Sequence, residues 1–285
     1  MRIGIGLPNP VPNTDGATLV EWARRSENAG FSSLATIDRI VYPSYDSLIS
    51  LAAAAAVTER IGLMTNILIA PARDAVLLAK EAASVDRLSG GRLTLGLSAG
   101  GRRDDFEAVA VDFETRGERF EHQLEVMNKL WRGEQLSGTG QASVPLPGRE
   151  VPILIGGSSD RAVERAAEVG MGYTAGGGGP DMMAPIVEKV RKAWSESGRE
   201  GEPRLVALSY FALGPNAKEG SSTYLKDYYG FLGQWADQIA ESAPTTPDAL
   251  KALATGFEDI GVDELILDPT IAELDQIERL ADILL

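Results

Sequence analysis

A turn rich in glycine and serine follows one expected strand and precedes an expected helix. The short apolar run 151–155 is typical of a buried strand, and Gly156, Gly157 and Ser158 come directly after it. Glycines let the backbone approach a ligand, serine hydroxyls donate hydrogen bonds, and a helix N-terminus attracts anions. The spacing predicts either a phosphate-binding turn or an ordinary tight turn. Gly176, the first of four glycines after the next expected strand, favours the phosphate site.

Asp38 and Arg39 follow the end of another expected strand, at residues 33–37. A carboxyl group at this end of a barrel strand can bind the edge of a ligand or assist proton transfer. Arg39 is always charged, so it could bind an anionic substrate or stabilise a reduced anionic cofactor, but it could not shuttle protons. We take these two as the candidate catalytic residues. A structural salt bridge between them is the alternative.

Asn66 lies near the end of a third expected strand, at residues 61–67. Its amide could bind a carbonyl group of a ring-shaped ligand, or it could cap a turn. A helical segment and the apolar run 93–97 follow, which completes a strand–helix–strand unit. Such crossovers place the carboxyl ends of parallel strands on one face, where ligands bind. We expect segments 66–74 and 98–103 to form two walls of an active site.

Short apolar runs alternate with helical segments along the whole chain. The expected strands are 2–7, 33–37, 61–67, 93–97, 151–155, 172–175, 204–213 and 264–267. The segment 133–150 is an excursion, and 215–246 is an aromatic-rich helical insertion after the seventh strand. Eight such units without a linker predict an α/β fold, a single-domain (β/α)8 TIM barrel over residues 1–285. A doubly wound open sheet is the competing topology.

Composition restricts the chemistry that the side chains can perform. The 285 residues include no cysteine and one histidine, His122. The lack of cysteine excludes disulfides, thiolate catalysis and Cys-ligated metals, and we expect no metal site. His122 falls almost opposite the apolar Phe120 on an expected helix, which predicts a surface histidine. Such a chain relies on carboxylates and arginines or takes its chemistry from a cofactor.

Charge and hydropathy restrict the expected partners and location. The formal net charge of −14 repels phosphate backbones, so we expect no nucleic-acid partner. No apolar run approaches the roughly 20 residues that cross a bilayer, and Met1-Arg2 leads straight into a strand without a signal peptide. We therefore expect a cytoplasmic protein that binds no membrane.

Three stretches of the sequence resemble the bacterial luciferase-like family of flavin- and deazaflavin-dependent oxidoreductases, the luciferase-like monooxygenases. They are Thr65-Asn66-Ile67-Leu68-Ile69-Ala70-Pro71, Lys80-Glu81-Ala82-Ala83 and Asp86-Arg87-Leu88-Ser89-Gly90-Gly91-Arg92. The resemblance implies oxidation or oxygenation of a small organic substrate at the mouth of a TIM barrel. FMN is the first cofactor that it implies, and coenzyme F420 is the alternative. It further implies a homodimer and a separate flavin or deazaflavin reductase.

The resemblance also implies roles for individual residues near the ring. Many family members have a bulge with a cis non-proline peptide at the position of Asn66-Ile67, where it supports the concave side of the isoalloxazine ring. Many also carry an acidic residue followed by histidine at the position of Asp38-Arg39. Arg39 stands in place of that histidine, so the family's catalytic histidine cannot be transferred to this chain.

The phosphate end of the cofactor is implied by a second group of positions. In this family the turns after the fifth and sixth strands hold the phosphate or its neighbouring chain, which implicates Gly156, Gly157, Ser158 and Gly176. Arg102 matches a position where some members supply a phosphate-binding arginine. A solvated ion pair between Arg102 and Asp104 or Asp105 is the alternative for that residue.

Two other functions remain open on the sequence. A flavin-binding protein without turnover would fit the missing histidine after Asp38. A non-redox barrel enzyme that acts on a sugar phosphate could use the same phosphate turns, but it would need a catalytic lysine or glutamate at a strand end. Lys80 and Glu81 lie in the middle of an expected helix instead.

Overall fold

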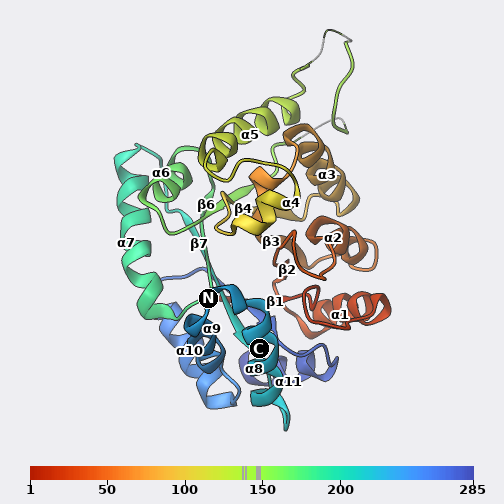
Figure 1. Ribbon diagram of the computed structural model, residues 1–285, viewed down its shortest axis with the longest axis vertical. Helices are drawn as coiled ribbons and strands as arrows, with labels where there is room; N and C mark the ends of the chain where they lie inside the picture. Colours follow the sequence, from red (N-terminus) through yellow and green to blue (C-terminus); the bar gives the residue numbers. More distant parts are fainter. Residues whose placement is uncertain (137, 139, 146–148) are drawn as a thin grey trace.

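Eight parallel strands pair in sequence order and close into a barrel in the computed structural model (Figure 1), which describes every residue except 137, 139 and 146–148. The strands are β1 (Arg2–Gly6), β2 (Ser33–Thr36), β3 (Gly62–Ile69), β4 (Leu93–Ser98), β5 (Ile153–Gly156), β6 (Gly172–Gly176), β7 (Arg204–Phe211) and β8 (Glu264–Pro269). The pairing of β1 with β8 closes the sheet. The predicted (β/α)8 barrel is therefore confirmed, and an open sheet is ruled out.

Helices surround the strands because each connection must return the chain to the same end of the barrel (Figure 1). They are α1 (Gly16–Ala29), α2 (Ser47–Ala55), α3 (Ala75–Leu88), α4 (Arg103–Ala108), α5 (Arg116–Trp131), α6 (Asp160–Val169), α7 (Pro180–Glu196), α8 (Ala217–Tyr228), α9 (Gln234–Ser242), α10 (Pro247–Asp259) and α11 (Asp275–Leu284), with short 3-10 turns η1 (Ala70–Ala72) and η2 (Gly230–Leu232). No helix in the described part of the chain is long and apolar enough to cross a membrane.

Several element boundaries differ from the expectation. β3 continues to Ile69. Its pairing with β4 shifts register between Thr65 and Leu68, and the apolar pattern of the sequence does not show this irregularity. β7 ends at Phe211, two residues early. The expected insertion after β7 consists of α8, η2 and α9. The expected excursion 133–150 includes residues 137, 139 and 146–148, which lie outside the described residues.

The interior of the barrel contains one small layer of apolar side chains. This layer consists of Ala35, Met64, Leu154, Val206 and Ile266. Beyond it, toward the carboxyl ends of the strands, β1, β5 and β6 end in glycine. Residues without side chains leave space at this end of the barrel, and ligands of TIM barrels bind there.

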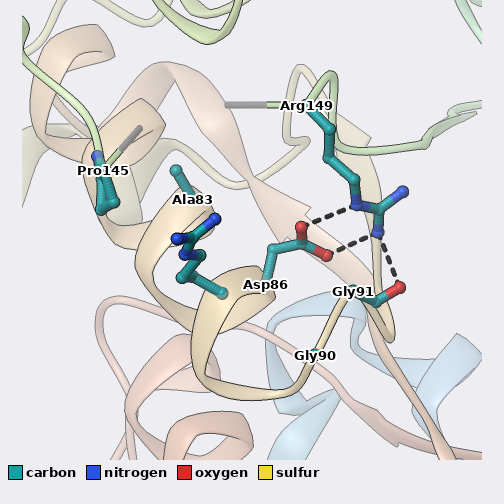
Figure 2. Close-up of a pocket in the computed structure, with 7 residues that line it drawn as sticks. Ala83, Asp86, Gly90, Gly91, Pro145 and Arg149 are labelled. Carbon is teal, nitrogen blue, oxygen red and sulfur yellow. Dashed lines mark hydrogen bonds and ion pairs between the residues drawn. The ribbon is translucent and has the colours of Figure 1, made fainter. Parts of the chain in front are cut away.

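Arg149 fastens the segment after α5 to the opposite, amino-terminal end of β4 (Figure 2). Its guanidinium group binds both carboxylate oxygens of Asp86, at 2.8 and 2.6 Å, and the carbonyl oxygen of Gly91 at 2.7 Å. Nearby, Arg92 donates to the carbonyl oxygens of Thr58 and Ile61 at 2.8 and 2.7 Å. These contacts give the Asp86–Arg92 stretch an architectural role, far from the strand ends that bind ligands.

Candidate functional site

A cavity of about 530 Å³ opens at the carboxyl ends of β3 to β6. Its walls come from the ends of these strands, from the turns that follow β4, β5 and β6, and from α5, α6 and α7. The lining includes Ile67, Gly100, Arg116, Gly156, Gly157, Ser158, Arg165, Gly176, Gly177 and Met182. The volume lies in the range of small-molecule and cofactor sites.

The turn after β5 exposes backbone at the floor of this cavity. A Cβ atom on Gly156 would overlap Ile67 Cδ1 and lie 3.1 Å from the carbonyl oxygen of Thr174, so only glycine fits. Gly157 has φ of +127°, a conformation that side chains disfavour. The hydroxyl of Ser159 accepts from the backbone of α6 and caps that helix. Exposed Gly157 and Ser158 thus sit at a helix N-terminus, where the dipole favours anions.

Two arginines line the same cavity. Arg165 of α6 is buried, donates to Glu121 at 2.9 Å, and keeps its Nε–H without a partner among the described residues. Arg116 of α5 donates to the carbonyl oxygens of Gly100 and Phe113, and no acidic side chain pairs with it in the described part of the chain. The turn after β5 and these two guanidinium groups together form a site suited to a phosphate.

The Asn66-Ile67 peptide bond is cis, as the family resemblance implies. The Asn66 Oδ1 atom accepts a hydrogen bond from Thr174 Oγ1 at 2.7 Å, and this contact fixes the orientation of the amide. Asn66 Nδ2 is buried without a partner among the described atoms. Asn66 itself does not line the cavity, whereas the neighbouring Ile67 does.

Asp38 is buried and held by three donors. Arg73 Nη2 lies 2.8 Å from Oδ1, the backbone N–H of Ile69 lies 3.0 Å from Oδ2, and Ser47 Oγ lies 3.3 Å from Oδ1. Burial raises the pKa of Asp38, and the charge of Arg73 opposes that rise. The carboxyl group ties the end of β3 to α2 and to the loop before α3.

Arg39 is buried in a different set of contacts. It pairs with Asp104 at 3.3 Å and Asp105 at 3.6 Å, and its guanidinium carbon lies 5.3 and 5.5 Å from the ring centres of Tyr42 and Tyr228. No ion pair joins Arg39 to Asp38 within the described residues, so the alternative of a structural salt bridge between them is wrong. The two candidate catalytic residues therefore belong to separate sets of contacts, because each pairs with an oppositely charged residue elsewhere in the sequence.

Arg102 lies outside the lining of the cavity. It pairs with Asp104 at 3.4 Å, donates to the carbonyl oxygen of Tyr228, and stacks 3.6 Å from the ring centre of Phe231. The ion pair with Asp104 is the alternative that the sequence offers for this residue. The cationic groups that line the cavity are instead Arg116 and Arg165, which sequence reasoning missed.

A signal for Arg165 is present in the sequence. It interrupts the buried face of α6, which otherwise carries Ala162, Val163, Ala166 and Ala167. A charged residue within an apolar helical stripe is rarely buried without a reason. The apolar stripe predicts that Arg165 is buried. Its approach to the turn after β5 depends on how α6 packs on the barrel.

Asp268, at the end of β8, is an isolated buried carboxyl group. It is 3% exposed, and neither of its oxygens has a partner among the described residues. A Cβ on Gly6 would overlap its carboxyl group, so the glycine makes room for it. Burial raises its pKa well above the usual range. Tyr210, its register partner on β7, contacts the Tyr229 hydroxyl at 2.7 Å.

The family model described as "Luciferase-like monooxygenase" matches residues 1–266. An uncharacterized Mycobacterium tuberculosis protein, Rv0940c, is 29% identical over 231 residues, which cover 70% of this chain and 80% of that protein.

Two solved structures share the fold over almost the whole chain. An F420-dependent secondary alcohol dehydrogenase, solved with an F420–acetone adduct, superposes with a TM-score of 0.80 at 15% identity, covering 99% of this chain and 98% of the other. The monooxygenase RslO1 from Streptomyces bottropensis superposes with a TM-score of 0.74 at 21% identity, covering 99% and 97%. These likenesses agree with the barrel described above.

Proposed function

Since this chain belongs to the luciferase-like monooxygenase family, we propose that it is an oxidoreductase that binds a flavin or deazaflavin at the carboxyl end of its barrel and acts on a small organic substrate. Members of this family are oxidoreductases. One observation carries the proposal: the anion site and Ile67, which follows the cis bond to Asn66, line the same 530 Å³ cavity. A cofactor that has a ring at one end and a phosphate at the other matches this arrangement.

The residues present suit the two ends of such a cofactor. Gly157 and Ser158 would hold the phosphate together with Arg165 and Arg116, whose guanidinium groups supply charge-assisted hydrogen bonds. Ile67, which lines the cavity next to the cis peptide bond, would contact the ring. When bound, the ring supplies the hydride or oxygen chemistry that this chain's own side chains lack. The chain's part is to bind, to orient and to exclude water.

Coenzyme F420 is the first cofactor that we propose. The support is the F420-dependent alcohol dehydrogenase, whose fold matches this chain along its whole length. When bound, the deazaflavin would supply hydride transfer to or from the substrate without oxygen.

FMN is the second candidate. The support is the two arginines that line the same cavity as the turn after β5, since guanidinium groups suit a terminal phosphate monoester. The reaction would then be an oxygenation, and a separate reductase would supply reduced flavin. This candidate agrees with the description of the family model.

Titration of the purified protein with F420 and with FMN, followed by the fluorescence of each, tests the proposal. We expect micromolar binding of one of them. Arg165→Met should weaken that binding about 10- to 150-fold, because one charge-assisted hydrogen bond contributes about 1.5–3 kcal/mol. Arg161→Met is the control, since Arg161 pairs with the same Glu121 but does not line the cavity. Failure of both cofactors to bind would refute the proposal.

We also propose that the protein forms a homodimer through α2 and α3. Ile49 on α2 and Leu77 on α3 are large apolar side chains that stay exposed, and the two helices contact each other. Together they form an apolar surface of the kind that interfaces cover.

A further inference from the structure

A second cavity, of about 600 Å³, lies between the glycine run after β6 and the insertion after β7. One wall is the backbone of Gly176–Gly179 with Met182 of α7. The opposite wall comes from the end of α8, from η2 and from α9, and includes Tyr229, Leu232 and Trp235. The insertion therefore covers this part of the carboxyl-terminal face, where barrel enzymes bind their substrates.

Large apolar side chains gather at this cavity although water can reach them. Met182 is 72% exposed, Trp235 is 59% exposed and Leu232 is 37% exposed. Single exposed apolar residues need no explanation, but three that line one concave surface mark a binding site. Trp235 also differs from the three other tryptophans of the chain, which are buried.

No charged side chain lines this second cavity among the described residues. Its polar groups are the Tyr229 hydroxyl and the side chains of Gln238 and Ser242. Burial raises the pKa of Tyr229 to about 12, so its hydroxyl stays neutral and can hydrogen-bond. The first cavity carries two arginines instead. A charged ligand would lose its hydration in the second cavity and would find no counterion there. A neutral ligand has no charge to desolvate, so the second cavity favours it.

The two cavities meet at shared residues. Gly176, Gly177 and Met182 line both. A Cβ on Gly177 would lie 4.0 Å from the Tyr229 hydroxyl, so the loop and the insertion approach each other where the cavities join. A ligand in the second cavity would thus lie beside a cofactor in the first.

We propose that the second cavity is the substrate site and that its substrate is a neutral, largely apolar molecule of small size with one or two hydrogen-bonding groups. This inference rests on the proposed function, since it places the substrate next to the cofactor. The apolar body packs on Met182, Leu232 and Trp235, and the polar group meets Tyr229 or Gln238. The insertion thereby determines the substrate class.

Two fluorescent probes with the same aromatic skeleton test the charge preference. N-phenyl-1-naphthylamine is neutral, and 1-anilinonaphthalene-8-sulfonate adds one negative charge. In phosphate buffer, which occupies the anion site, we expect the neutral probe to bind at least tenfold more tightly and to quench the emission of Trp235. Equal binding of the two probes would overturn the inference.

A matched pair of variants tests the location. Leu232→Glu places a charge at the cavity and should weaken binding of the neutral probe at least tenfold. Leu88→Glu makes the same change at a 71% exposed leucine at the end of α3 that does not line the cavity, and should leave binding within twofold. Unchanged binding in Leu232→Glu would overturn the inference. Conversion of a dimer to monomers by that variant would also overturn it, because the surface would then be an interface between copies.

The cofactor titration separates this inference from the proposed function. If neither cofactor binds while the neutral probe binds with the expected preference, the proposed function fails and the apolar site remains. If a cofactor binds and the neutral probe does not, the inference fails alone.

Discussion

Two buried acids on one strand are expected to respond to pH in opposite directions. Glu264 begins β8 and Asp268 lies four residues later, and both are almost inaccessible to water. Burial would raise the pKa of Glu264, but hydrogen bonds from Ser32 and Ser33, together with the charge of Arg204, lower it overall. Asp268 has no such partners, and burial raises its pKa. The amides Glu264→Gln and Asp268→Asn keep each shape and remove the titration.

The sign for Asp268 follows from proton binding. Its pKa in the folded protein lies well above the 3.8 of an unperturbed aspartate, so the folded state binds the proton more tightly. Its contribution to the free energy of unfolding is present below pH 3.8 and is lost as the pH rises toward the folded-state pKa, by up to about 1.4 kcal/mol for each pH unit. Asp268→Asn should therefore be more stable than the wild type at neutral pH, and the difference should shrink as the pH falls.

Glu264 should behave in the opposite way. Its folded-state pKa lies below the 4.5 of an unperturbed glutamate, so its contribution is present above pH 4.5 and is lost as the pH falls through the folded-state pKa. Arg204 lies 2.5 Å from its carboxylate, and breaking a buried pair of this kind costs about 3–5 kcal/mol. Glu264→Gln should be destabilised by about that much at neutral pH and by less in acid.

Urea unfolding of the three proteins between pH 4 and pH 8 measures both effects. The two variants are matched in strand, in type of substitution and in burial of the acid. The sign of each difference in the free energy of unfolding therefore reports only the partners of that acid. If both variants were destabilised at pH 7, or if the Asp268→Asn difference did not change with pH, the assignment of an unpartnered Asp268 with a raised pKa would be refuted.

Two further predictions concern packing. Gly156→Ala would drive a Cβ into Ile67 Cδ1, so we expect a loss of about 1–3 kcal/mol in the free energy of unfolding by urea, together with weaker cofactor binding. A Gly117→Ala variant, whose Cβ would meet open space within α5, is the control, and an equal loss there would contradict the close packing at Gly156. Ile49→Glu should convert the proposed dimer into monomers in sedimentation velocity, and a sedimentation coefficient equal to that of the wild type would contradict an interface at α2.

The order and number of the elements could be predicted from the sequence because their signals are local. The run 93–97 carries leucine at positions 93, 95 and 97 and is buried at every position, and the observed strand covers Leu93–Ser98. The glycine-rich turn after the expected strand 151–155 also lies where the local pattern puts it, at the N-terminus of α6. The resemblance to the luciferase-like family pointed to the cis bond at Asn66-Ile67, which the apolar pattern alone does not reveal.

The partners of the charged groups could not be predicted in this way. Asp38 binds Arg73, which lies 35 residues further along the chain, and Arg39 binds Asp104 and Asp105 instead of its neighbour. Each choice depends on which loops meet when the barrel closes. Sequence spacing measures distance along the chain, whereas a salt bridge requires proximity in space.

The sequence by itself determined the class of the fold: an eight-unit α/β barrel, poor in histidine and lacking cysteine. Only the tertiary structure decided which cations line the cavity, Arg116 and Arg165 in place of Arg102, and that an uncharged apolar cavity adjoins it. The physical reason is that periodicity and turn chemistry act within a few residues. The walls of a site come from segments that meet only after the first and last strands have paired.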